Sequence, residues 1–223
     1  MKVDAVIVAA GASTRFGDED KLLADLAGRP VVAWSLAAYE ACPSVERIVV
    51  VASSASVPAI EPIAHRWAPA KFMQVVPGGL RRRDSVEAGL RASRSRYVAI
   101  HDGARPLVTT AAIERCIAAA EGRPGAISAV PVTDTIKEVR DSLIMAHPDR
   151  AGLWAAQTPQ VVLRQAWLDA AAAGDDDETD DAAMLDRLGL QVVVAKGDPE
   201  NIKITRPLDL EFARVILQQR GLE

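Results

Sequence analysis

The sequence predicts an α/β fold in which a mostly parallel, twisted sheet carries helices on both faces. Short apolar runs rich in Val and Ile recur along the chain, and stretches with helical periodicity separate them. The chain has 223 residues, of which 49% are hydrophobic and 25% are charged, and this balance suits one sizeable core. We therefore expect residues 1–223 to form a single domain.

Six apolar runs have the length and β-branched content of buried strands. They are Ala5–Ala10, Arg47–Ala52, Phe72–Val76, Tyr97–His101, Ala126–Val130 and Gln191–Ala195. Helical periodicity predicts six helices between and after them, two of which begin next to Pro30 and Pro207. These helices are Val31–Ala41, Pro58–Trp67, Ser85–Ala92, Thr110–Glu121, Ala182–Leu188 and Leu208–Arg220. Strands that alternate with helices favour parallel pairing.

One section interrupts the alternation. Thr133–His147 has strand-like character on both sides of Asp141-Ser142, which is a plausible turn. We predict a β-arm, inserted at 133–150, that projects from the α/β frame. Because an isolated hairpin is only marginally stable in water, the arm should pack against something, and a second copy of the chain is the simplest candidate.

Composition excludes several classes of function. A net charge of −4 gives no global support for a nucleic-acid partner. No apolar run approaches the roughly 20 residues that span a bilayer, and Asp4 precedes a short apolar run unlike that of a signal peptide. Cys42 and Cys116 lie far apart in the sequence and are typical of reduced thiols in a cytoplasmic protein.

The first strand ends in small residues, Ala9, Ala10 and Gly11, and two cations follow, Arg15 and Lys21. Small residues let backbone N–H groups approach an anion, and the cations can neutralise it. Open α/β sheets bind ligands at this edge, so the stretch predicts a triphosphate site. A tight strand–loop–helix turn with two surface cations is the alternative.

A second loop, Gly78–Val86, follows a predicted strand and opens a helix. Its glycines allow close backbone approach, and Ser85 could hydrogen-bond a ligand. The loop lacks the Walker spacing, so a base- or ribose-holding role is as consistent as a phosphate role. A glycine turn with Ser85 as a helix cap remains open.

Two further segments carry charged groups to the same edge. Asp102 comes directly after a predicted buried strand and could hold Mg²⁺ against phosphate oxygens, with Arg105 pairing with it or with a phosphate. His101, at the end of that strand, is more typical of a structural histidine. Lys203 precedes the last helix and could meet a phosphate. The acidic run 175–181 is typical of a solvated loop ending in helix-capping residues.

Seven pieces of the chain together resemble the cytidylyltransferases that act on 2-C-methyl-D-erythritol 4-phosphate. They are AAGASTRFG with Lys21, GRPVVAWSL, GGLRRRDSVEAGL, HDGARPLV, VTDTIK, LWAAQTPQ and NIKITRPLDL. The resemblance implies a Rossmann-like nucleotidyltransferase fold with a projecting β-arm that forms a homodimer. It also implies the joining of CTP and the sugar phosphate into a CDP-alcohol, with release of diphosphate and with Mg²⁺ or another divalent metal.

The resemblance also assigns residues. For the triphosphate of CTP it implies Ala9, Ala10, Gly11 and Arg15, with Lys21 as a second phosphate cation. For cytosine and ribose it implies Gly79 and Ser85. The central acidic motif corresponds to Asp102, Ala104 and Arg105. On the acceptor side it implies Thr135, Arg150, Thr158, Thr179 and Lys203. Thr135 and Arg150, on the arm, would serve the partner's site. Arg15, Lys21, Arg150 and Lys203 are the candidate catalytic cations.

Three alternatives stay open at this point. A ribitol 5-phosphate cytidylyltransferase has similar motifs and would differ in its acceptor residues. A molybdopterin nucleotidyltransferase is suggested by STRFGDEDKLL. A nucleotide-binding regulatory module on the same fold would bind CTP without releasing diphosphate.

Overall fold

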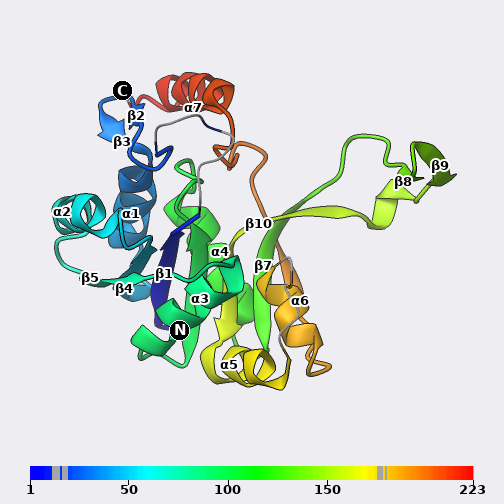
Figure 1. Ribbon diagram of the computed structural model, residues 1–223, viewed down its shortest axis with the longest axis horizontal. Coiled ribbons are helices and arrows are strands. Elements are labelled where there is room, and N and C mark those ends of the chain that lie inside the picture. The colour runs from blue at the N-terminus through cyan, green and yellow to red at the C-terminus, as the bar shows by residue number, and fades with distance from the viewer. Residues whose placement is uncertain (12–15, 17–19, 175–177, 179, 223) are drawn as a thin grey trace.

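The computed structural model describes residues 1–11, 16, 20–174, 178 and 180–222 (Figure 1). Its centre is a seven-stranded sheet with the strand order β11-β7-β10-β6-β1-β4-β5. The pairs β1–β4, β1–β6, β4–β5 and β7–β11 are parallel, whereas β10 runs antiparallel to both of its neighbours. The predicted α/β class with a mostly parallel sheet is confirmed.

The sheet strands are β1 (Val3–Ala9), β4 (Val45–Ala52), β5 (Phe72–Pro77), β6 (Tyr97–Asp102), β7 (Gly125–Pro131), β10 (Trp154–Leu163) and β11 (Val193–Lys196). The helices are α1 (Val31–Ala41), α2 (Val57–Trp67), α3 (Arg82–Ala92), α4 (Thr110–Ala120), α5 (Arg164–Ala173), α6 (Asp181–Asp186) and α7 (Pro207–Gln219), with a 3-10 turn at Arg150–Gly152. Two short ribbons complete the fold, β2 (Asp25–Leu26) with β3 (Arg29–Pro30), and β8 (Glu138–Arg140) with β9 (Leu143–Ala146).

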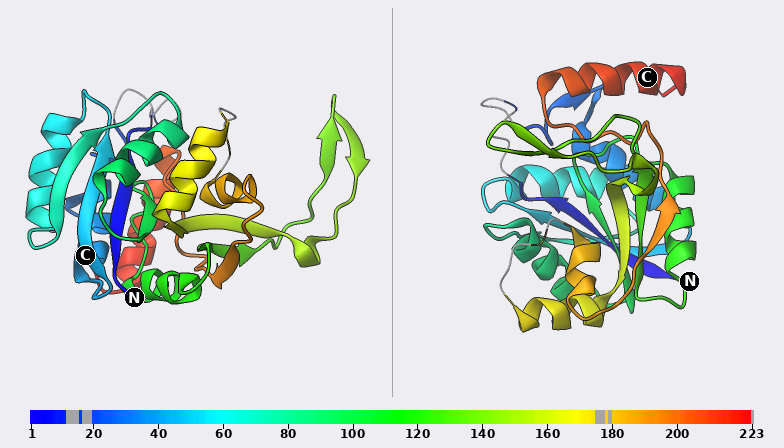
Figure 2. Two further views of the ribbon diagram at one scale, coloured as in Figure 1. Left: turned by 90° about the horizontal axis from the view of Figure 1, so that it is seen from below. Right: turned by 90° about the vertical axis from the view of Figure 1, so that its right-hand side faces the viewer.

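Successive residues of β1 enter different cores, because side chains alternate across a strand. Ala5, Ile7 and Ala9 join a cluster with α1, α2 and α4, whereas Val6 joins a second cluster with α3, α5 and α6. The two helix layers therefore cover opposite faces of the sheet (Figure 2). With both faces buried, the inner strands are mostly apolar.

A third, smaller cluster packs α7 against the β2–β3 ribbon and the start of α1. The Trp34 indole N–H donates to the Leu26 carbonyl oxygen at 2.9 Å. The Arg29 guanidinium lies 4.4 Å from the ring centroids of both Trp34 and Trp67, a stacked arrangement that favours arginine over lysine. The cluster joins the last helix, α7, to the first, α1, and the contacts of Arg29 tie the ribbon to α1 and α2.

The sequence prediction lacks the antiparallel strand β10 and the helix α5 that follows it, as well as the short β2–β3 ribbon. The first residues of β10, Trp154 to Ala156, are exposed, and the pairing register with β7 shifts between Ala156 and Gln160. The strand therefore has neither a continuous apolar run nor a clean alternation. Because no strand is predicted before it, the Ala-rich stretch of α5 is not recognised as a helix that follows a strand.

The first residues of two helices differ from those that the sequence predicts. Helix α3 begins at Arg82 rather than Ser85, because the Asp84 carboxylate accepts from the Arg81 N–H at 3.1 Å and closes the first turn. Helix α6 begins at Asp181, and the Asp180 carboxylate accepts from the Ala183 N–H at 2.9 Å. The predicted capping is confirmed, but the solvated interpretation is wrong for Asp181, which is 1% exposed.

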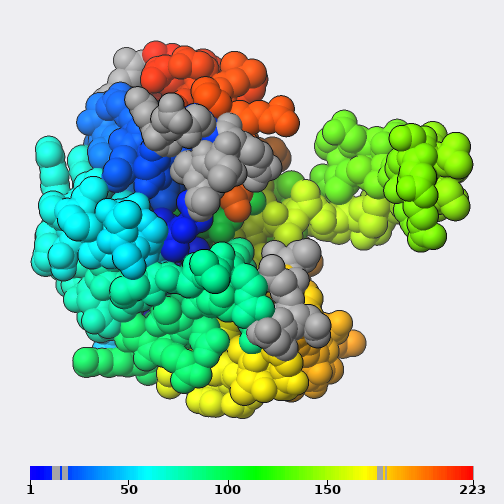
Figure 3. All heavy atoms as spheres, in the orientation of Figure 1, coloured from blue at the N-terminus to red at the C-terminus, as the bar shows by residue number. Residues whose placement is uncertain are grey.

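The arm projects from the body of the molecule, as Figures 1 and 3 show. Asp141 and Ser142 have φ values of 48° and 65°, which is the geometry of a tight hairpin turn, so the predicted turn is confirmed. At its base, Pro131 of β7 pairs with Trp154 of β10. The tip exposes Val139, Leu143, Ile144 and Met145, each more than half accessible.

None of the helices within the described residues combines the length and the apolar character that crossing a bilayer requires.

Candidate active site

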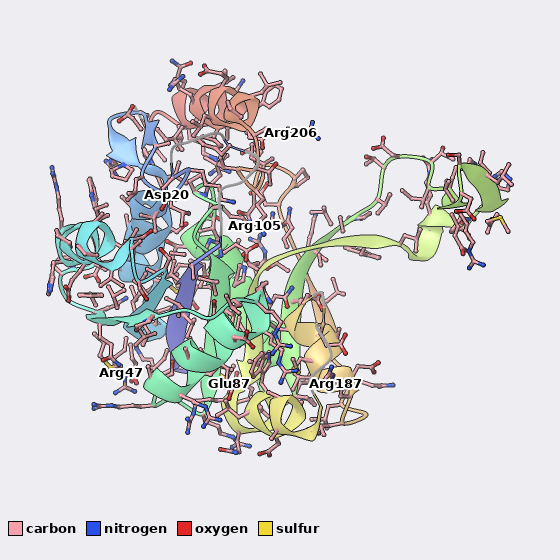
Figure 4. The ribbon with its side chains drawn as sticks, viewed as in Figure 1. Asp20, Arg47, Glu87, Arg105, Arg187 and Arg206 are labelled. Carbon is pink, nitrogen blue, oxygen red and sulfur yellow. The ribbon has the colours of Figure 1, made fainter. Side chains whose placement is uncertain are left out.

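A pocket of about 370 Å³ opens at the carboxyl ends of β1 and β6, beside the amino end of α3. In Figure 4, Asp20 and Arg105 lie toward this end of the molecule, and Arg47 and Glu87 lie toward the other. The lining residues come from the four segments that the sequence singled out. They are Val8, Ala10, Gly11, Lys21, Leu22, Gly79, Leu80, Arg81, Arg82, Ser85, Asp102, Ala104 and Lys203.

Asp102, the last residue of β6, is surrounded by three cations. Lys203 Nζ lies 2.8 Å from Oδ2, Arg105 Nε lies 3.6 Å from the same oxygen, and Arg82 Nε lies 3.7 Å from Oδ1. Burial alone would raise the pKa of Asp102, but Lys203, Arg82 and Arg105 outweigh it and hold the pKa well below its usual range. The carboxylate therefore stays ionised, and the pocket carries a net positive charge suited to anions.

His101 lies beneath the pocket and fixes the position of Asp102. Its Nε2 lies 3.2 Å from the Arg105 carbonyl oxygen, which can only accept, so Nε2 carries the proton. Nδ1 then accepts from the Thr158 hydroxyl at 3.0 Å, and that hydroxyl accepts from the Asp102 N–H at 3.1 Å. The structural interpretation of this histidine is confirmed, since it is fully buried.

The burial of His101 predicts a pH dependence of stability. Burial lowers its pKa from 6.5 to about 4, so the unfolded chain binds this proton more readily than the folded one. Stability should fall as pH drops from 6.5 toward 4, by up to about 3 kcal/mol, and this loss should level off below that range. Urea unfolding across this range checks it, with His101→Gln losing this component and His65→Gln, on α2, retaining it.

The second loop is shaped by Ser85 and two glycines. The Ser85 hydroxyl accepts from the Gly79 N–H at 3.2 Å and lies 3.3 Å from the Arg81 carbonyl oxygen. A Cβ at Gly78 would lie 2.4 Å from the Ala10 Cβ, so glycine allows this loop to approach the first one. Ser85 is 2% exposed and is not the helix cap, which is Arg81.

The first loop is described at its two ends. The Asp20 carboxylate accepts from the Leu22 N–H at 3.0 Å and from the Ser56 hydroxyl at 3.2 Å, which anchors Lys21 at the pocket rim. Ala9 pairs with Ala52 inside the sheet, and Ala10 and Gly11 reach the pocket. Arg15 lies outside the described residues.

The remaining predicted site residues lie beside Asp102, on the arm or outside the described residues. Arg105 and Thr158 lie beside Asp102 and bond within the protein, where Arg105 Nη1 donates to the Asn201 carbonyl oxygen at 2.8 Å. Lys203 is held by its neighbour Ile204, whose N–H donates to the Ala104 carbonyl oxygen at 2.8 Å. Thr135 and Arg150 are exposed on the arm, away from this pocket, and Arg150 Nη1 donates to the Thr133 carbonyl oxygen at 2.6 Å. Thr179 lies outside the described residues.

Of the pocket cations that sequence reasoning missed, Arg82 is the one that faces Asp102. It stands in a run of three arginines whose members look alike in the sequence but separate in the structure. Arg81 pairs with Asp84, Arg83 donates to carbonyl oxygens at the end of α5, and Arg82 faces Asp102. Its position at the first turn of α3 was the available signal, once the helix start is placed correctly.

The pocket suits a divalent cation held together with phosphates. Among the described residues, no group of three His, Cys, Asp or Glu side chains could form a cage of protein ligands. Mg²⁺ commonly uses one or two carboxylates, with substrate phosphates and water completing its shell. The ionised Asp102 at the pocket wall fits that pattern.

Comparison with known proteins identifies the family. The model of IspD, 2-C-methyl-D-erythritol 4-phosphate cytidylyltransferase, matches residues 3–219. Enzymes of that name from Synechococcus elongatus and Prochlorococcus marinus are similar to the chain. The first is 42% identical over 222 residues and covers 96% of each chain, and the second is 43% identical over 225 residues and covers 97% of this chain and 98% of the relative.

Solved structures agree with the sequence relatives. The 4-diphosphocytidyl-2C-methyl-D-erythritol synthase of Anaerococcus prevotii has a TM-score of 0.85 at 27% identity, covering 97% of this chain and 98% of its own. The 2-C-methyl-D-erythritol 4-phosphate cytidylyltransferase of Thermus thermophilus has a TM-score of 0.80 at 26% identity, covering 98% of this chain and 100% of its own. The chain belongs to the 2-C-methyl-D-erythritol 4-phosphate cytidylyltransferase family.

Proposed function

We propose that this protein transfers a cytidylyl group from CTP to 2-C-methyl-D-erythritol 4-phosphate, forming 4-diphosphocytidyl-2-C-methyl-D-erythritol and diphosphate in non-mevalonate isoprenoid biosynthesis. The observation that carries the proposal is the pocket, lined by Lys21, in which Lys203 and Arg82 flank an ionised Asp102. Two anionic substrates must meet in such a site, and clustered cations lower the repulsion between them. Family membership supports this acceptor over ribitol phosphate or molybdopterin.

The acceptor phosphate is itself a nucleophile, so the reaction requires no covalent intermediate and no general base. One of its oxygens attacks the α-phosphorus of CTP in line, and the bond to diphosphate breaks opposite. Arg15 and Lys21 bind the triphosphate and stabilise the charge that develops, while Lys203 and Arg150 position the acceptor phosphate. Ala9, Ala10 and Gly11 hold the triphosphate, and Gly79 and Ser85 hold the cytidine.

Asp102 would hold Mg²⁺, which when bound neutralises phosphate charge on CTP. Ala104 and Arg105 form the turn that presents this carboxylate. Arg105 ties the turn to the segment before Lys203 through Asn201, which keeps the acidic and basic groups of the site in one rigid unit.

The arm, residues 133–150, serves a homodimer in this proposal. Its exposed apolar tip supports burial against a second copy, and the remoteness of Thr135 and Arg150 from their own pocket supports service to the partner's site. Thr158 and Thr179 complete the acceptor site. The free, buried Cys42 and Cys116 support a cytoplasmic location.

A direct assay distinguishes the candidate functions. Purified protein with CTP and Mg²⁺ should release diphosphate with 2-C-methyl-D-erythritol 4-phosphate and far more slowly with ribitol 5-phosphate. Release with ribitol 5-phosphate alone would favour the related polyol enzyme. CTP binding by calorimetry without diphosphate release with either acceptor would favour a regulatory module.

A further inference from the structure

Arg82 connects two carboxylates that belong to different parts of the fold. Its Nε lies 3.7 Å from Asp102 Oδ1, at the pocket, and its Nη2 lies 2.7 Å from Asp181 Oδ2, at the start of α6. Lys203 and Arg105 lie nearest the other oxygen of Asp102. Arg82 therefore fixes the side of this carboxylate that those two cations do not hold.

The Asp181 carboxylate is buried and has few polar partners. It is 1% exposed, and its Oδ1 accepts from the Trp167 indole N–H at 3.0 Å. Its backbone N–H donates to Gln160 Oε1 at 2.9 Å, which ties it to β10. Arg82 is the charged partner that offsets the cost of its burial, so the pair is held in one geometry.

We propose that Arg82 is a positioning residue for cytidylyl transfer. It holds the Asp102 carboxylate in its orientation and couples it through Asp181 to Trp167 and the α5–α6 segment. The inference rests on the proposed function of the same pocket. A planar guanidinium can contact two carboxylates at once, whereas the ammonium of lysine is a single point of charge. The bridge, rather than the positive charge alone, is what the site uses.

The test compares Arg82→Lys and Arg82→Gln with the wild type. Loss of a residue that orients a ligating group commonly costs about 10–100-fold in activity or metal affinity. We expect both variants to lose kcat in that range, with the KM for the acceptor changing less than the kcat. Arg82→Lys should fail to rescue more than a small part of the loss, because it keeps the charge without the bridge.

Arg83→Gln is the matched control for a purely structural effect. Arg83 is the next residue of α3 and binds the Gly174 and Ala171 carbonyl oxygens at 2.7 Å each, without lining the pocket. It should lower the melting temperature and leave kcat and KM near wild type at a permissive temperature. If Arg83→Gln and Arg82→Lys lower kcat equally, or if Arg82→Lys is as active as wild type, the proposal is overturned.

Two further readouts follow the coupling, one in turnover and one in the emission of Trp167. Asp181→Asn, which lies outside the pocket lining, should lower kcat several-fold, and its combination with Arg82→Gln should cost less than the two losses multiplied together. CTP with Mg²⁺ should change the emission of Trp167, isolated by difference from Trp167→Phe, in wild type but not in Arg82→Gln. Equal emission changes in both proteins would contradict the coupling.

These outcomes separate this inference from the proposed function. If wild type binds CTP but releases no diphosphate with the methylerythritol phosphate, the proposed function fails. The Trp167 response and the calorimetric affinity for CTP with Mg²⁺ then still test Arg82, since neither needs the acceptor. If Arg82→Gln binds CTP as tightly as wild type does and shows the same change in Trp167 emission under those conditions, its positioning role is overturned.

Discussion

Replacing Lys203 with alanine should lower kcat by about 10²–10³, the loss that follows removal of one preorganised charge contact at a reacting phosphate. Lys203 lies 2.8 Å from Asp102 at the pocket wall, and the backbone of Ile204 fixes its loop. The same change at Lys21, which also lines the pocket, should have a similar effect. Steady-state assays of diphosphate release measure both losses.

The control for these variants is Lys196→Ala. Lys196 is exposed at the end of β11 and lies outside the pocket lining, so its loss should leave kcat and KM unchanged. All three proteins should unfold near the wild-type temperature, because each removes a partly or fully accessible side chain. Turnover close to wild type in both Lys21→Ala and Lys203→Ala would remove these residues from the catalytic role.

Mixing two inactive variants should restore activity if the arm serves the partner's site. Lys203→Ala damages the body of one subunit, and Arg150→Ala damages the arm. In a mixed dimer, one of the two sites receives an intact Lys203 and an intact Arg150, and random pairing of equal amounts should restore about a quarter of wild-type activity. Co-refolding or co-expression of the two chains, followed by the diphosphate assay, checks this.

Two controls define the result. A double variant carrying both changes, mixed with either single variant, cannot assemble an intact site and should stay inactive. Arg140→Ala, at an exposed position of the same arm, should be active without a partner variant. An inactive mixture in which mixed dimers are demonstrated would mean that Lys203 and Arg150 act in the same subunit.

The sequence predicts what depends on local pattern. The parallel strands have apolar runs because both of their faces are buried, and the turn at Asp141-Ser142 uses residues that tolerate positive φ. Strand β10 could not be read in this way. Its exposed start extends beyond the covered sheet, and its register shift breaks the period on which such predictions depend.

The site divides in the same way. Asp102 is predictable because an acid directly after a buried strand must lie at the sheet edge. Arg82 and Asp181 are not predictable in this way, because the role of each depends on its contact with the other, and the two lie far apart in the sequence. An arginine run and an acidic run each resemble a solvated surface until the fold places the partly buried Arg82 beside the buried Asp181.

The antiparallel β10 has a consequence for how the arm could be altered. Since β7 runs into the arm and β10 returns from it, both connections leave the sheet at one paired position, Pro131 and Trp154. Paired strands at that position are close enough for a short hairpin turn to join them. The arm can therefore be replaced at this position while the β7–β10 pairing is kept, and we expect the body of the molecule to keep its fold when arms are exchanged between relatives.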